Sequence, residues 1–147
     1  MTVSAISSET LHASCVAIGG RAVLISGGSG SGKSDLALRL IDRGAELVSD
    51  DYTIVRRVEG QLIASPPQTI AGKLEVRGLG ILERAYVQGA PVCLAIDLAR
   101  GAARMPEPDE ALLVAGIRLP AIALNALEAS APIKAELALE RYGLRPA

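Results

Sequence analysis

The feature that most constrains this chain is a glycine-rich stretch that ends in a lysine and a serine. It consists of Gly27, Gly28, Ser29, Gly30, Ser31, Gly32, Lys33 and Ser34. The stretch fits the phosphate-binding pattern G-x-x-x-x-G-K-[ST] at every fixed position. Glycines let the backbone turn its N–H groups inward around a phosphate, and a following helix directs its positive end to the same place. The pattern predicts a bound phosphorylated ligand such as a nucleotide, with Lys33 at the outer phosphates and Ser34 as a Mg²⁺ ligand.

The residues on either side of this stretch favour the same interpretation. Residues 21–26 form a short apolar run typical of a buried strand. Residues 35–43 have apolar side chains at helical spacing, and Gly44 suits the end of that helix. A flexible glycine and serine linker would not place Lys33 and Ser34 at a strand-to-helix junction, so the sequence predicts a strand, a phosphate loop and a helix.

Length and composition favour a single α/β domain. The chain has 147 residues, of which 50% are hydrophobic but only 2% aromatic, so its core must consist mainly of aliphatic side chains. Such a core suits parallel strands covered by helices. We expect residues 1–10 to be a flexible N-terminus and residues 11–147 to form one domain.

Charge and hydropathy exclude several classes of protein. The net charge of −1 and the lack of a basic cluster argue against a nucleic-acid partner. The apolar runs are shorter than the roughly 20 residues of a membrane span, and the first residues lack signal-peptide features. A cytoplasmic protein is therefore expected. Cys15 and Cys93 lie in apolar runs without C-x-x-C spacing, which predicts buried thiols instead of a disulfide or zinc site.

A second chemical signal follows the predicted helix. Residues 46–49 form a short strand that ends in Asp50 and Asp51. Open α/β sheets hold their ligands at the carboxyl ends of strands, where one carboxylate could serve a metal and the other could act as a general base. An Asp-Asp turn without function is the alternative. His12, the only histidine, is similarly open between an exposed strand-end residue and a catalytic role.

Two further charged residues, Glu75 and Arg77, lie in a segment, residues 74–82, that begins with alternating charged and apolar residues. In a strand they would share one face, so they could contact a metal and a phosphate, or form a surface ion pair. Both interpretations remain open at this point.

The other elements are predicted from turns and periodicity. Gly19 and Gly20 indicate a hairpin that joins residues 11–18 to the strand before the glycine-rich stretch. The remaining predictions are a hairpin of residues 52–58 and 61–64, a loop over 65–73, strands over 92–98 and 115–124 with the latter broken by Pro120, a loop over 100–110, and a helix from 126 or 130 to 142.

Residues 11–143 resemble the catalytic, C-terminal domain of HPr kinase/phosphorylase. The resemblance rests on Leu11-His12, the glycine-rich stretch, the Leu-Val-Ser-Asp-Asp sequence of residues 47–51, and the Leu-Glu-Val-Arg-Gly-Leu-Gly-Ile sequence of residues 74–81. It implies a P-loop kinase fold like the nucleotide domain of phosphoenolpyruvate carboxykinase, with a central mixed sheet and flanking helices. It also implies ATP and Mg²⁺ as cofactors, and a serine of the phosphocarrier protein HPr, or of a paralogue, as the acceptor.

The resemblance assigns roles to the candidate residues. His12 and Lys33 become active-site residues, and Asp51 becomes the proton acceptor from the substrate serine. The Mg²⁺ ligands it implies are Ser34 and Glu75.

Two further roles follow from the same resemblance. Asp50 would assist in placing the metal or the base. Arg104 lies where the family has an arginine that contacts phosphate.

The chain also departs from the family pattern. Only about ten residues precede Leu11, where the family has a further N-terminal domain, and residues 119–125 lack the glycine and arginine of a loop associated with the reverse, phosphate-dependent reaction. This argues against phosphorylase activity. The resemblance implies a homo-oligomer, since the family forms hexamers, but the lack of the N-terminal domain leaves the oligomeric state open. A kinase for another acceptor, or a nucleotide-sensing regulator without transfer activity, are the alternative functions.

Overall fold

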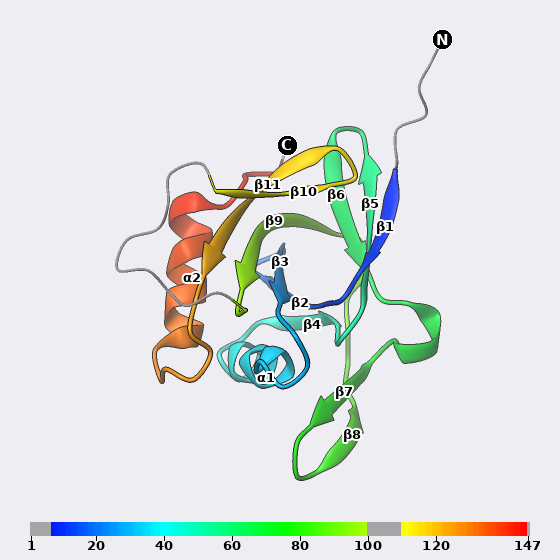
Figure 1. The fold of residues 1–147 in the computed structure, drawn as a ribbon. Helices are drawn as coiled ribbons and strands as arrows, with labels where there is room; N and C mark the ends of the chain where they lie inside the picture. The colour runs from blue at the N-terminus through cyan, green and yellow to red at the C-terminus, as the bar shows by residue number, and fades with distance from the viewer. Residues whose placement is uncertain (1–6, 100–109, 147) are drawn as a thin grey trace.

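The computed structural model describes residues 7–99 and 110–146, which form a curved sheet with two main helices (Figure 1). Nine strands make one sheet, and two others form a separate hairpin. The strands are β1 (Ser8–Leu11), β2 (Ala13–Ile18), β3 (Arg21–Ser26), β4 (Glu46–Ser49), β5 (Thr53–Val58), β6 (Gln61–Ser65), β7 (Lys73–Val76), β8 (Gly80–Glu83), β9 (Ala90–Asp97), β10 (Ala111–Val114) and β11 (Ile117–Ala123). The helices are α1 (Lys33–Asp42), the short 3-10 helix η1 (Gln68–Ile70) and α2 (Ala131–Tyr142).

The large sheet is mixed and branches at β9. Its main order is β1-β5-β6-β9-β3-β2-β4, while β11 also pairs with β9 and β10 pairs with β11. β6 pairs with the first residues of β9, and β11 pairs with Ala95, Ile96 and Asp97 at its end. Because β3 and β11 both run parallel to β9, their carboxyl ends lie at the same edge of the sheet. This edge is where an open α/β sheet holds its ligand.

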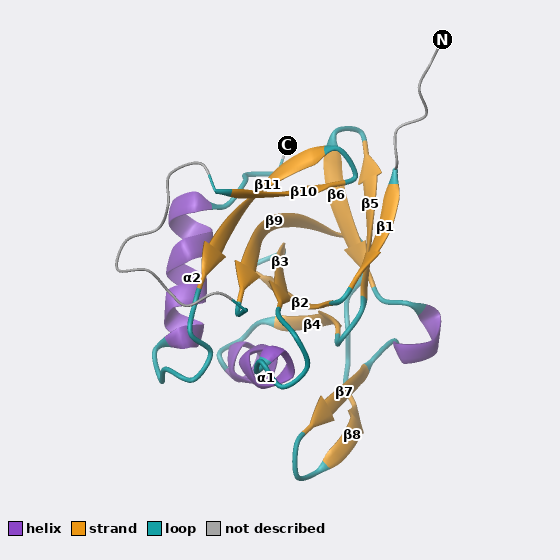
Figure 2. Cartoon of the chain, in the orientation of Figure 1, coloured by secondary structure: helices purple, strands orange, loops and turns teal. Residues whose placement is uncertain are grey.

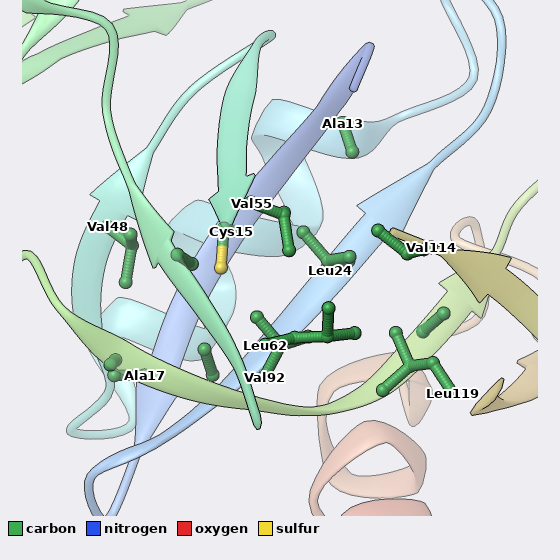
Figure 3. Packing of buried hydrophobic residues seen from close by; sticks show 14 of the residues in the cluster. Ala13, Cys15, Ala17, Leu24, Val48, Val55, Leu62, Val92, Val114 and Leu119 are labelled. Atoms are coloured by element: carbon green, nitrogen blue, oxygen red, sulfur yellow. The ribbon is translucent and has the colours of Figure 1, made fainter. Parts of the chain in front are cut away.

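Alternation along the central strands divides the apolar side chains between two cores. Ala13, Cys15 and Ala17 of β2 belong to one cluster, whereas Val16 belongs to the other. The first core lies inside the curl of the sheet, where Leu24 approaches side chains from strands far apart in sequence (Figure 3). The second core lies between the sheet and both helices. Both faces of β2 and β3 are therefore buried, which explains their continuous apolar sequences.

The helices α1 and α2 lie on one face of the sheet, as Figure 2 shows. α1 begins directly after the glycine-rich stretch, and the chain leaves it through Gly44 in the left-handed region at φ 111°. α2 has a proline in its first turn, where a missing N–H costs nothing, and Gly143 caps its C-terminal end. In the described part of the chain, neither helix has the length and apolar character needed to cross a bilayer. The α/β class, the mixed sheet and the two predicted helices are confirmed.

The predicted strand over residues 115–124 is wrong in one respect, because this region is the second half of a hairpin. Ala115 and Gly116, with φ values of 46° and 82°, form a tight turn between β10 and β11. Pro120 does not break β11. It pairs with Ala111 of β10 at the position where β11 passes to β9, whose pairing starts at Ala121. A residue without an N–H is tolerated at such a change of partner.

Three other predictions need correction in detail. β1 begins at Ser8, inside the segment expected to be flexible, and pairs with β5. The loop over residues 65–73 contains the 3-10 helix η1. The segment beginning at Leu74 is a hairpin whose turn contains Gly78 at φ 90°. Arg77 therefore lies in the turn after β7 and not in the strand.

Candidate active site

The glycine-rich stretch forms the loop between β3 and α1. A Cβ atom at Gly27 would lie 2.5 Å from Ser31 Oγ, so only glycine fits there. Gly32 precedes α1 in the left-handed region at φ 99°. Lys33 is buried, and its Nζ donates hydrogen bonds to the carbonyl oxygens of Gly27 at 3.0 Å and Gly28 at 3.3 Å. The loop thus wraps around the ammonium group of Lys33.

Asp50 is the buried centre of the site. Its Oδ1 accepts hydrogen bonds from Ser34 Oγ at 2.6 Å and from Ser14 Oγ at 2.9 Å. Its Oδ2 accepts a bond from the backbone N–H of Glu75 at 3.0 Å. With only 5% of its surface exposed, this carboxylate joins the start of α1, the start of β2 and the hairpin β7–β8. Asp50 therefore holds these three elements together through its hydrogen bonds.

Asp51 projects from the turn after β4 and faces His12. Its φ of 69° lies in the left-handed region, which is strained for most residues and tolerated best by Asn and Asp. Asp51 Oδ1 lies 2.9 Å from His12 Nε2, and the imidazole stacks on the ring of Tyr52 with centroids 4.9 Å apart. Both side chains of the pair are about half exposed, at 41% for His12 and 56% for Asp51. His12 therefore lies in the site and not simply at a solvent-facing strand end.

Ser14 is a further residue of the site, which no sequence motif indicated. This fully buried residue donates to Asp50 and accepts a hydrogen bond from the backbone N–H of Asp51 at 3.1 Å. It therefore connects the two carboxylate residues. A buried hydroxyl in the otherwise apolar strand β2, two residues after His12, was the available signal.

The hairpin β7–β8 forms the second wall of a cleft of about 780 Å³. The cleft has the glycine-rich loop and α1 on one side and Glu75, Arg77 and Lys73 on the other. Glu75 and Arg77 are exposed, and no ion pair joins these two described side chains. The surface ion pair considered from sequence is therefore absent, and both groups face the cleft.

Other expected features are placed as follows. Cys15 and Cys93 are buried free thiols, as predicted, and burial raises the pKa of both. Arg104 lies outside the described residues. The segment 119–125 is not a loop before the last helix, because its first part belongs to β11 and Leu119 is fully buried. Across residues 7–99 and 110–146, no three His, Cys, Asp or Glu side chains form a metal-binding group.

The architecture is that of an α/β domain with its candidate ligand site at the carboxyl edge of the sheet. Residues 4–96 match the family model for the HPr Serine kinase C-terminal domain. A solved structure of the Hpr(Ser) kinase/phosphatase from Coxiella burnetii matches with a TM-score of 0.75 and 30% identity, over 90% of this chain and 88% of that chain. The chain belongs to the HPr kinase C-terminal domain family, which confirms the resemblance seen in the sequence.

Curated relatives agree with this assignment. The HPr kinase/phosphorylase of Clostridium tetani is 51% identical over 73 residues, which is 50% of this chain and 24% of that protein. The HPr kinase/phosphorylase of Clostridium beijerinckii is 47% identical over 79 residues, or 54% of this chain and 26% of that protein. The aligned region thus spans about a quarter of the length of these relatives.

Proposed function

We propose that this chain is an ATP- and Mg²⁺-dependent protein kinase that phosphorylates a serine of the phosphocarrier protein HPr. Kinase chemistry is supported by the family, whose curated members are HPr kinase/phosphorylases. The observation that carries the proposal is that Lys33, Ser34, Asp50 and Asp51 line one cleft. Lys33 supplies a cation, Ser34 a candidate metal-binding oxygen, and Asp51 a carboxylate for the proton of the acceptor, while Asp50 orients Ser34. Phosphoryl transfer requires groups of these kinds.

The loop residues fit a nucleotide phosphate. The tight packing of Gly27 against Ser31 allows the backbone, and not side chains, to approach the ligand. Ser31 Oγ is buried without a hydrogen-bond partner among the described residues, so a polar group of the loop is available. The N-terminus of α1 adds unpaired N–H groups and the positive end of its dipole. These features favour a bound phosphate chain over a small neutral ligand.

The donor set also fits Mg²⁺, which prefers oxygen ligands and retains waters and substrate phosphates. Because Ser34 donates its proton to Asp50 at 2.6 Å, the lone pairs of Ser34 Oγ remain for a cation. Ser34 and Glu75 would hold the ion, and Asp50 would orient Ser34. A bound Mg²⁺ supplies positive charge that offsets the charge of the nucleotide phosphates.

The reacting groups then have distinct tasks. Asp51 accepts the hydroxyl proton of the acceptor serine. At the same time the serine oxygen bonds to the γ-phosphorus of ATP, and the bond from that phosphorus to ADP breaks. Lys33 stabilises the negative charge on the transferred phosphoryl group. His12 holds Asp51 Oδ1 at 2.9 Å, which leaves Oδ2 to receive the proton. The proposal covers only this forward direction.

Phosphotransfer from γ-labelled ATP to purified HPr, with Mg²⁺, tests the proposal. Asp51→Asn should abolish transfer and leave the Kd for ATP nearly unchanged, because Asp51 contacts the acceptor and not the loop. Asp42→Asn, an exposed carboxylate at the end of α1, is the matched control and should behave as wild type. Transfer by Asp51→Asn at the wild-type rate would refute the assigned role. ATP binding by wild type without transfer to HPr would favour a regulator or another acceptor.

A further inference from the structure

The loop between β11 and α2, residues 124–130, lies beside the glycine-rich loop. It follows the carboxyl end of β11. Both β11 and β3 pair in parallel with β9. The two loops therefore leave the same edge of the sheet, from the two parallel strands that flank β9. Ala126 is buried, and a Cβ atom at Gly32 would lie only 3.0 Å from its Cβ. The loop thus packs directly against the start of α1.

Arg39 fixes the conformation of this loop. Its guanidinium donates hydrogen bonds to the carbonyl oxygens of Ala126 and Glu128, while its Nε lies 3.0 Å from Asp35 Oδ2. Asn125 Oδ1 accepts a hydrogen bond from the backbone N–H of Leu127 at 3.0 Å. A second ion pair joins Lys134 to Glu128 at 2.9 Å. Contacts from both helices therefore hold the loop in one shape.

That shape leaves Leu127 91% exposed, although the residue lines the same cleft as Lys33 and Ser34. Leu38, one turn further along α1 than Ser34, adds a second apolar side chain to the cleft. Because contacts from both helices fix the loop, Leu127 can contact a bound ligand without a rearrangement of the loop. The cleft therefore has charged and polar groups for phosphates and, next to them, an apolar surface.

We propose that Leu127 forms one wall of the subsite for the purine base of the nucleotide, and that Arg39 is the positioning residue that holds this wall. The inference rests on the proposed nucleotide site and names the part of the cleft that contacts the base. A purine fits this surface because it is flat, largely apolar on its faces and attached to the phosphates that the glycine-rich loop receives. The subsite contributes to affinity for the base and not for the phosphates.

Calorimetric titration with two probes, Mg²⁺-ATP and Mg²⁺-tripolyphosphate, separates these contributions. Leu127→Ser should raise the Kd for ATP about tenfold and leave the Kd for tripolyphosphate unchanged. Arg39→Gln should produce the same difference between the two probes, because it releases the wall without touching the phosphate loop. Leu113→Ser is the matched control, since Leu113 is 67% exposed on β10 outside the cleft, and it should change neither Kd.

The outcomes distinguish the two proposals. If Leu127→Ser leaves ATP binding unchanged, or weakens both probes equally, the base subsite is wrong while the phosphate site stands. The same holds if wild type binds ATP no more tightly than tripolyphosphate. If wild type binds neither probe, the proposed nucleotide site fails and the base subsite fails with it.

Discussion

Replacing Ser14 by alanine removes a hydroxyl that joins both carboxylate residues of the candidate site. Asp50 Oδ1 loses a hydrogen bond of 2.9 Å, and the backbone N–H of Asp51 loses its acceptor at 3.1 Å. A hydrogen bond to a charged group contributes about 1.5–3 kcal/mol, and the partly buried N–H of Asp51 adds a smaller loss because water can reach it. We expect Ser14→Ala to lower the free energy of unfolding by about 3 kcal/mol. With an m value of about 1–3 kcal/mol/M, the urea midpoint should fall by about 1–3 M.

Urea denaturation followed by circular dichroism measures this midpoint. Ser8→Ala, at an exposed position of β1, is the matched control and should change the midpoint little. Ser14→Ala should also reduce kcat for transfer to HPr more than it raises the KM for ATP, because Asp51 loses its hydrogen bond to Ser14 while the glycine-rich loop is intact. A midpoint shift for Ser14→Ala no larger than that of Ser8→Ala would refute the assignment of Ser14 as the link between the carboxylates.

Three further predictions concern the glycine-rich loop and the buried thiols. Gly27→Ala should raise the Kd for ATP by about tenfold or more in calorimetry, because its Cβ would lie 2.5 Å from Ser31 Oγ; Ser8→Ala, at an exposed position of β1 outside the cleft, should change it little. An equal effect of both variants would contradict the packing argument. Cys15 and Cys93 should resist a thiol reagent at pH 8 until the protein is unfolded, because burial raises the pKa of both. Rapid labelling of the native protein would contradict this. For the same reason, the free energy of unfolding should fall above about pH 9, because the unfolded chain releases thiol protons that the native protein retains.

Features set by local sequence could be predicted well. The strand, loop and helix around Gly27 are recognisable because the glycines, Lys33 and the apolar periodicity lie next to one another in sequence. Gly19 and Gly20 fixed the turn between β2 and β3 in the same way, and their φ values of 58° and 82° explain why glycines stand there.

Features set by strand pairing could not be predicted. Ser14 approaches Asp50 because β2 pairs with β4 through Cys15 and Ser49, and no local pattern records that pairing. β10 was missed because its short segment exposes three of its four residues, so it lacks a buried alternating pattern. Pro120 was wrongly predicted to break the strand. At that residue the pairing partner changes from β10 to β9, and this change is a property of the assembled sheet and not of the local sequence.

The candidate site shows the same division. The sequence identified the residue types, and the family resemblance implied Ser34 and Glu75 as metal ligands. The structure adds that the partner of Ser34 is Asp50, and that Glu75 reaches this group through its backbone N–H. Such a contact depends on where β7 lies beside α1, which spacing along the chain does not determine.

The branching of the sheet at β9 has a consequence for synthesis of the protein. All the described residues proposed for catalysis or metal binding, from His12 to Glu75, emerge from the ribosome before β9, which begins at Ala90. Until then, β3 and β6 lack the strand that lies between them, and each has an edge open to other chains. The completed phosphate-loop sequence thus exists before the sheet that supports it.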